Sequence, residues 1–214
     1  MERKILRYEG KDLTVTYERP RCIHAERCVK DLPEVFNPKR QPWVEADATP
    51  VELLAAIIHT CPSGALHYER NDGGSIETAP ENNTATLAAN GPLWFLGDLV
   101  VNGVEGEKKE FRAALCRCGA SQYKPFCDGS HEKLPFNDDG KGKPGNIEDG
   151  LAQGGLTINP AADGPLMLSG PLEIRNANSE VIFRGQKTAL CRSGASGNKP
   201  FCDGSHMGIG FTAD

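Results

Sequence analysis

The sequence predicts an α+β chain, in which a small α+β domain comes first and a mostly β tandem unit follows. The 24 Gly and 15 Pro residues, with an apolar fraction of 38%, favour short strands and turns over long helices. One clear helix start lies in the first part, near Pro50. In the second part, the run 114–131 recurs at 189–206 with 15 of 18 positions identical. Two such halves predict a pseudo-twofold pair that closes a shared β-sandwich.

The domain boundaries are expected at joints rich in Gly, Asp and Asn. We expect the first domain over residues 1–72, the first repeat module over 76–136 and the second over 151–214. The polar stretch 137–150 lacks the apolar residues needed to bury itself, so we interpret it as a linker.

In the first domain, residues 13–18 alternate as a half-buried strand. A helix start follows, with Thr49 as the N-cap, Pro50 at the first position and Glu52 three residues after the cap. The helix is expected to run to about His59 and to lead into Cys61.

The repeat extends upstream of the cysteines. Gly91-Pro92-Leu93 corresponds to Gly164-Pro165-Leu166, and a strand is then expected to enter each motif, over 110–115 and over 181–190. Between these points, residues 97–101 correspond to residues 170–174.

Composition narrows the classes of function. The net charge is −5 without a basic block, which argues against a nucleic-acid partner. The first residues lack the apolar core of a signal peptide, and no segment approaches the roughly 18 apolar residues of a membrane span. We therefore expect a soluble, cytoplasmic protein without membrane contact. In a reducing compartment, eight clustered cysteines indicate metal binding or redox chemistry rather than disulfides.

The first copy of the run offers four soft ligands within 16 residues: Cys116, Cys118, Cys127 and His131. The Cys-x-Cys spacing is tighter than the spacing usual in zinc fingers, whereas the Cys-x3-His end suits zinc or iron equally. A structural zinc protein therefore stays an alternative at this point.

Two further residues are expected to support the ligands. Asp128 would cap the turn that carries Cys127 and His131, and Lys124 would offset the negative charge of the thiolates. Asp203 and Lys199 repeat these roles in the second copy.

The run Cys-Arg-Cys-Gly-Ala-Ser-Gln-Tyr-Lys-Pro-Phe-Cys-Asp-Gly-Ser-His resembles the CDGSH iron–sulfur domain family, the family of mitoNEET, and with its second copy the resemblance covers about residues 90–214. The resemblance implies a 2Fe–2S cluster held by three Cys and one His. Cys116 and Cys118 would hold the inner iron, and Cys127 and His131 the outer, more exposed iron. It also implies a β-sandwich shared by two cluster modules, so that the chain would be a monomer with an internal pseudo-dimer.

The second copy offers Cys191, Ser193, Cys202 and His206, and departs from the family at Ser193. Three interpretations stay open. Ser193 ligates iron and gives a site of lower potential, a neighbouring group or water replaces it, or the site is empty and the copy serves only as the sandwich partner. The retained Cys202 and His206 favour a bound cluster.

Three cysteines of the first domain follow a ferredoxin-like spacing. Bacterial ferredoxins use Cys-x2-Cys-x2-Cys-x3-Cys-Pro. Cys22 and Cys28 match its first and third ligands, Ala25 takes the second position, and Leu32 takes the fourth. Cys61-Pro62 then supplies a further ligand, so one cluster site survives with one ligand fewer.

Residues 5–70 resemble the divergent 4Fe–4S mono-cluster domain, through Cys-Ile-His-Ala-Glu-Arg-Cys, Pro42-Trp43-Val44 and Cys-Pro-Ser-Gly-Ala-Leu. Three Cys suit a 3Fe–4S cluster directly. A 4Fe–4S cluster would take a fourth ligand from water, or from His24 if that side chain turns inward. The alternative is that the three Cys pack without metal.

These observations predict an iron–sulfur electron-transfer protein that is not an enzyme, since no acid, base or nucleophile constellation is evident. Two alternatives are a donor that delivers a 2Fe–2S cluster to an apo-protein through the His131 end, and a redox or iron sensor. The expected partner is a redox protein or an apo-protein acceptor, and the acidic charge suits a basic docking face. Because His ligates iron, the potential is expected to depend on pH.

Overall fold

A computed structural model describes residues 4–103 and 108–213 of the chain. These residues form two compact units, one up to Thr78 and one from Ala79 onward. Each unit has its own sheet and its own core. No helix among the described residues is long and apolar enough to cross a membrane.

The first unit is built on a three-stranded antiparallel sheet, whose order is β1-β2-β3. Its strands are β1 (Ile5–Tyr8), β2 (Leu13–Glu18) and β3 (Leu66–Arg70), and its helices are η1 (Arg19–Arg21), α1 (Arg27–Asp31), η2 (Ala46–Ala48) and α2 (Val51–His59). The alternating residues of β2 send Val15 and its neighbours into a core completed by Leu54 and Ile58 of α2. The predicted strand over 13–18 is confirmed.

The predicted helix near Pro50 is also confirmed as α2, but its cap differs from the expectation. Pro50, rather than Thr49, is the N-cap, and no side chain bonds to the helix start. The Pro50 carbonyl accepts from the N–H groups of Leu53 and Leu54, both at 3.1 Å. Thr49 ends the preceding η2 turn in an extended conformation, which explains why its hydroxyl does not cap α2.

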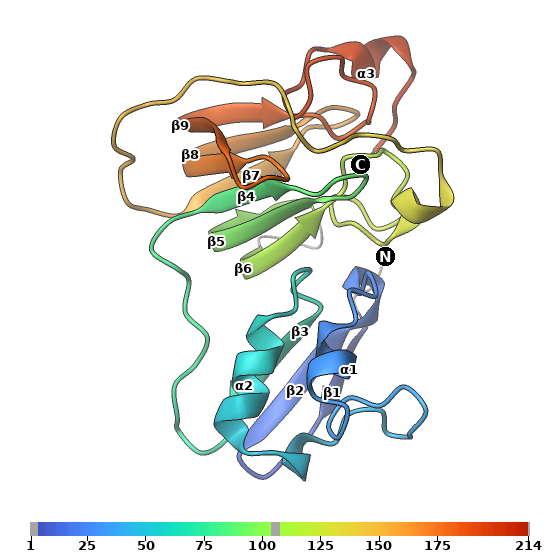
Figure 1. Cartoon of the computed structure of the whole chain (residues 1–214), viewed down its shortest axis with the longest axis vertical. Coiled ribbons are helices and arrows are strands. Elements are labelled where there is room, and N and C mark those ends of the chain that lie inside the picture. Colours follow the sequence, from blue (N-terminus) through green and yellow to red (C-terminus); the bar gives the residue numbers. More distant parts are fainter. Residues whose placement is uncertain (1–3, 104–107, 214) are drawn as a thin grey trace. The chain divides into compact units, whose positions relative to one another are not determined.

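The second unit is mostly β and contains one six-stranded sheet (Figure 1). The first repeat supplies three strands and the η3 turn, and the second repeat supplies three strands and the α3 turn. Their bounds are β4 (Thr84–Leu87), β5 (Leu93–Val101), β6 (Lys108–Leu115), η3 (Ser130–Lys133), β7 (Leu156–Pro160), β8 (Leu166–Arg175), β9 (Val181–Leu190) and α3 (Ser205–Gly208). The strands expected to enter the two motifs are therefore confirmed as the ends of β6 and β9.

Each repeat pairs one of its strands with a strand of the other repeat, and we call this a strand exchange. β4 of the first repeat pairs in parallel with β8 of the second, and β7 of the second pairs in parallel with β5 of the first. Asn83 fastens this exchange, because its side-chain amide donates to the carbonyls of Gly154 (2.8 Å) and Pro171 (2.9 Å). Both repeats bury their apolar residues in one common core, so neither has a core of its own.

The correspondence between residues 97–101 and 170–174 has a structural counterpart. Strands β5 and β6 shift register between Leu96 and Leu99, and β8 and β9 shift between Ser169 and Leu172. Each shift lies at the repeated glycine, where a bulge needs a residue without a side chain. At Gly97, for example, an added Cβ would lie 2.3 Å from the amide oxygen of Asn83.

The polar stretch 137–150 joins the repeats as expected, but it lies against the sheet rather than standing free. The N–H of Gly145 donates to the carbonyl of Ile182 at 2.7 Å. A Cβ at Gly145 would lie 2.6 Å from the ring of Phe201, so glycine allows this close approach. The stretch stays mostly exposed, as its polar composition predicts, and its backbone rather than apolar side chains makes the contacts with the sheet.

Candidate metal centre

The first ligand loop begins and ends at the same point of the sheet. β6 ends at Leu115, and the chain returns antiparallel to it through Phe126. The N–H of Cys116 donates to the Pro125 carbonyl (2.9 Å), and the N–H of Cys127 donates to the Ala114 carbonyl (2.8 Å). This hairpin neck brings together two cysteines that are eleven positions apart in the sequence.

The four candidate ligands of this loop form two close pairs. The Sγ atoms of Cys116 and Cys118 are 3.7 Å apart, and Cys127 Sγ is 3.3 Å from His131 Nδ1. Among residues 4–103 and 108–213, no three Cys, His, Asp or Glu side chains gather closely enough to hold a single metal ion. Two separate pairs suit a centre with two metal atoms better than one tetrahedral zinc.

Asp128 braces the turn that presents the second pair. Its Oδ1 accepts from the N–H (3.0 Å) and the hydroxyl (2.6 Å) of Ser130, and its Oδ2 accepts from the N–H of Gln122 (2.8 Å). These bonds hold the start of η3, on which His131 lies one residue later. Asp203 makes the matching bonds to Ser205 and Gly197.

The two lysines brace the loops from within. Lys124 Nζ donates to the Ser121 carbonyl, and Lys199 Nζ donates to the Ser196 carbonyl, both at 2.7 Å. Each lysine therefore stabilises the backbone of its own loop, and this contact is separate from the expected effect of its charge on the thiols.

Burial and contact between neighbouring thiols set the pKa values of the three cysteines in this loop. Burial raises the pKa of the Cys127 thiol to about 12. The neighbouring Cys118 thiol, together with nearby backbone N–H groups, lowers the pKa of Cys116 to about 6, and Cys118 is raised in return. Without a cation, these cysteines therefore keep most of their protons, and a bound metal would displace them.

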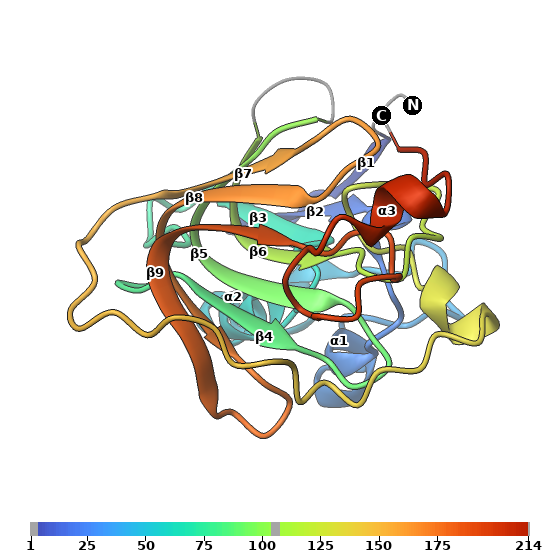
Figure 2. The same cartoon turned by 90° about the horizontal axis from the view of Figure 1, so that it is seen from above.

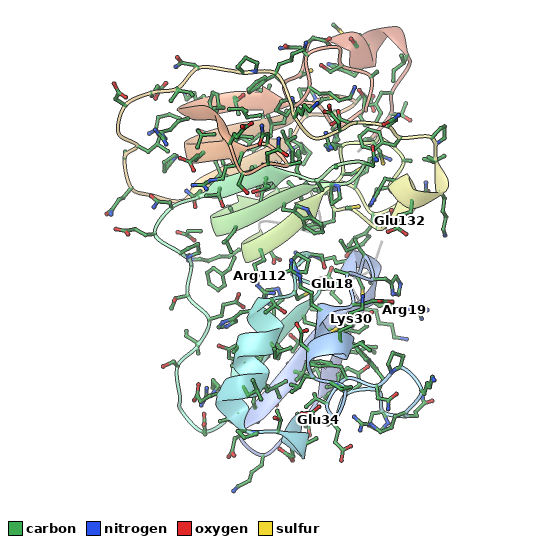
Figure 3. All side chains as sticks on the ribbon, viewed as in Figure 1. Glu18, Arg19, Lys30, Glu34, Arg112 and Glu132 are labelled. Carbon is green, nitrogen blue, oxygen red and sulfur yellow. The ribbon has the colours of Figure 1, made fainter. Side chains whose placement is uncertain are left out.

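His131 presents its Nδ1 atom to the site while its other nitrogen lies toward Gly91, where an added Cβ would be 3.8 Å from Nε2. Burial lowers the pKa of His131, an effect that the nearby charge of Glu132 opposes. Glu132 follows on the same η3 turn (Figure 3). His131 is therefore biased toward the neutral form that ligates metals.

The second loop has the same neck. The N–H of Cys191 donates to the Pro200 carbonyl (2.8 Å), and the N–H of Cys202 donates to the Ala189 carbonyl (2.9 Å). Figure 2 shows the η3 and α3 turns at the same end of the sheet.

Ser193 takes the place of Cys118 in the second loop. Its Oγ is 3.8 Å from the Sγ of Cys191. The Nδ1 atom of His206 is buried and has no hydrogen-bond partner in the described part of the chain. A buried ring nitrogen without a partner is costly unless something coordinates it, so this donor set also fits a metal group.

The remaining three cysteines line one pocket of the first unit. Cys22, Cys28 and Cys61 line it together with the rings of Tyr17 and Trp43, and it encloses about 360 Å³ of unfilled space, part of it open to solvent. Burial raises the pKa of Cys28 to about 11, and the other two thiols add to this effect. Like the two ligand loops, this site therefore favours a cation that would displace the thiol protons.

Among the described residues that line this pocket, there is no cysteine or histidine besides these three cysteines. Ala25 lines it at the position where ferredoxins have their second cysteine. His24 is exposed, has a positive φ of 53° and is not among the lining residues, so the condition under which it would supply a fourth ligand is not met.

Two contributors to this pocket were missed from the sequence. Ser63 Oγ lies 3.7 Å from Cys61 Sγ, and the Tyr17 hydroxyl forms a hydrogen bond with the Cys22 thiol. The Ser after Cys61-Pro62 was visible in the sequence, but only the folded sheet brings Tyr17 to Cys22. Lys30, on the α1 helix beside the pocket (Figure 3), pairs with Glu26 at 3.0 Å.

Comparisons with known proteins agree with this layout. The family described as "Divergent 4Fe-4S mono-cluster" matches residues 8–71, and the family described as "Iron-binding zinc finger CDGSH type" matches residues 90–132 and 163–207. The "Uncharacterized protein YjdI" of Escherichia coli K12 is 39% identical over 61 residues, which is 28% of this chain and 80% of the relative. The YjdI of Escherichia coli O157:H7 matches equally. No solved structure matches the chain.

Proposed function

We infer the following function for this chain, which belongs to the divergent 4Fe-4S mono-cluster family. The chain joins a domain of that family to two regions of the iron-binding CDGSH type. It is an iron–sulfur protein with three candidate cluster sites.

We propose that the first repeat holds a 2Fe–2S cluster through Cys116, Cys118, Cys127 and His131. The observation that carries this proposal is the division of the four ligands into two pairs, at 3.7 Å and 3.3 Å. The bound cluster would supply reversible one-electron chemistry, and replacement of a thiolate by imidazole raises its potential. The protein contributes the neck that fixes the pairs and the burial that keeps water from Cys116 and Cys127.

We propose that the second repeat holds a similar cluster with Ser193 in place of the missing thiolate. The buried, unpartnered Nδ1 of His206 and the closeness of Ser193 Oγ to Cys191 Sγ support this. A serine oxygen stabilises the oxidised form more than a thiolate does, so the second site would have the lower potential. The exchanged pairings of β4 with β8 and of β7 with β5 support a pseudo-twofold β-sandwich as the common scaffold.

For the first unit we propose a 3Fe–4S cluster on Cys22, Cys28 and Cys61, or a 4Fe–4S cluster with one iron open to solvent beside Ala25. The variant Ala25→Cys supplies the missing thiolate. It should raise the iron content by about one per chain and abolish the EPR signal of an oxidised three-iron cluster. An unchanged signal would mean that Ala25 does not face the cluster.

We propose electron transfer as the role, with a redox protein that offers a basic docking face as the partner. The net charge of −5 supports such a partner. In the first loop the Cys and His side chains lie in pairs that suit metal ligation, which supports a carrier rather than an enzyme. We propose that this carrier works as a monomer.

The experiment that tests the proposal is iron and sulfide analysis of anaerobically purified protein, with EPR of its oxidised and reduced forms. About two irons per chain means that one repeat is loaded, about four means both, and about seven or eight adds the first unit. Zinc in place of iron, with no visible absorbance, would refute it. Rapid reduction without loss of iron is expected for an electron carrier.

Delivery of a cluster to an apo-protein is a second candidate, because His131 and His206 are only partly buried. Mixing the loaded protein with an apo-ferredoxin separates the roles. Appearance of the acceptor's cluster, with matching loss from this protein, would favour delivery over electron transfer.

A further inference from the structure

The two ligand loops touch each other through their backbones. A Cβ added at Gly119 would lie 2.5 Å from the carbonyl oxygen of Ser193, and one added at Gly194 would lie 2.9 Å from the carbonyl oxygen of Cys118. Both glycines have a positive φ, of 82° and 84°. Only glycine fits at these two positions, so each loop forms part of the wall of the other repeat's site.

An arginine lies in each of these loops, between the first two ligand positions, and both arginines are buried. Their backbone contacts correspond. Arg117 Nε donates to the Gly91 carbonyl (2.7 Å) and Nη2 to Ala88, while Arg192 Nε donates to the Gly164 carbonyl (2.9 Å) and Nη2 to Ala161 (2.5 Å). The two side chains therefore have the same pose in the two repeats.

The repeats differ at the third nitrogen of the guanidinium. Arg117 Nη1 binds the carboxylate of Asp138 at 2.7 Å, whereas Arg192 Nη1 is buried and has no hydrogen-bond partner among residues 4–103 and 108–213. Arg192 Nη2 donates instead to a further backbone acceptor, the Ala213 carbonyl, at 3.2 Å. The positive charge of Arg192 thus lacks the carboxylate that neutralises its counterpart.

Cys116 of the first repeat is one of two groups, with Asp163, whose negative charge acts on Arg192. Burial lowers the pKa of Arg192, while the charges of Cys116 and Asp163 oppose that change. Burying a cation without a counter-ion is costly. A 2Fe–2S group on three thiolates and a neutral His carries one negative charge when oxidised and two when reduced. A nearby cation therefore favours the reduced form.

We propose that Arg192 of the second repeat sets the reduction potential of the cluster held by the first repeat, with its buried Nη1 as the uncompensated cation across the loop contact. The proposal rests on the proposed function. It assigns a role to the second repeat whether or not Ser193 ligates iron, because Arg192 carries its positive charge in both cases.

The test is redox titration of the full chain, followed by EPR, in a Cys202→Ser background so that only the first repeat reports as a 2Fe–2S signal. Arg192→Gln removes the charge and should lower the midpoint potential. Arg192→Lys keeps the charge and should restore most of the shift. Equal shifts in both variants, or none in either, would overturn the proposal. An absence of any 2Fe–2S signal in the wild-type chain would instead overturn the proposed function, and this inference with it.

A second variant covers the case in which Arg192→Gln does not fold. Asp163→Asn removes the only other anion that acts on Arg192 in the described residues, and it keeps the Oδ1 atom that accepts from the Ala213 N–H at 2.7 Å. Asn also tolerates the positive φ of 48° at this position. The variant should raise the potential of the first repeat more than the surface control Asp149→Asn does. An equal shift in the two would count against Arg192.

Discussion

Cys118 and Ser193 occupy the same position in two loops that otherwise share their neck, their capping aspartate and their bracing lysine. Thiolate and hydroxyl differ in charge and softness far more than in size. At this ligand position the two sites differ in one atom, Sγ of Cys118 against Oγ of Ser193, while the loops keep the same conformation at the neck. The effect of each ligand can therefore be tested without rebuilding the fold.

Ser193→Cys should convert the second repeat into a copy of the first. The thiol fits, since Ser193 Oγ already lies 3.8 Å from Cys191 Sγ. We expect slower loss of iron from the second site and convergence of the two potentials. EPR-monitored titration checks this, with Ser205→Cys as a control that adds a thiol off the ligand positions. Two potentials that stay as far apart as before would contradict a ligand role for Ser193.

His131 should make iron loss depend on pH. Burial lowers the pKa of His131, so above the ordinary His value the ring is neutral in both folded and unfolded chains, and its contribution to stability is complete. As the pH falls below that value, protonation competes for Nδ1. The decay of visible absorbance should therefore accelerate from about pH 8 to about pH 6. In His131→Cys the decay should be slower and flatter with pH, and the potential lower. The same rate at both pH values in the wild type would argue against His ligation.

At the scale of elements, the hairpin neck after β6 and β9 is the device that makes a binding site. Two backbone hydrogen bonds at each neck place the cysteines of the first and third ligand positions side by side. Between them the loop is held by side-chain bonds to its own backbone, so the ligand pairs are preorganised before any metal arrives.

Asp128→Ala should weaken this preorganisation. Loss of the bonds to Ser130 and Gln122 is expected to cost about 1 kcal/mol, measured by urea unfolding of the apo-protein, and to shorten the lifetime of the iron centre. Burial alone would raise the pKa of Asp128, but these hydrogen bonds lower it overall. The stabilisation is thus complete above the ordinary Asp pKa and is lost as the pH falls through the lower native value. Glu132→Ala, on the same exposed turn, is the control and should change little.

At the scale of the whole molecule, the described residues form two cores, whereas the two family models match three regions of the chain. The two CDGSH-type repeats bury one common core and exchange strand pairings, so neither repeat completes a sheet alone. The first unit, in contrast, has its own sheet and core.

Division of the chain should therefore succeed at one joint and fail at the other. Residues 1–78 and residues 79–214, expressed separately, should each unfold in one cooperative transition. Residues 79–136 alone should stay unfolded, because their apolar strand faces lack β7 and β8 as partners. Thermal unfolding followed by circular dichroism checks all three. A cooperative transition of residues 79–136 would show that one repeat is self-sufficient.

The sequence by itself determined which residues are candidate ligands, that the motif is doubled, and where β2, α2 and the ends of β6 and β9 lie. These features are local, since spacing, turn residues and periodicity are written along the chain. Only the tertiary structure decided that the ligands fall into two pairs, that the stretch 137–150 lies on the sheet, that His24 does not line the pocket of the three cysteines, and that the two ligand loops touch at Gly119 and Gly194. Those outcomes depend on contacts between residues far apart in sequence, which packing selects and which spacing does not encode.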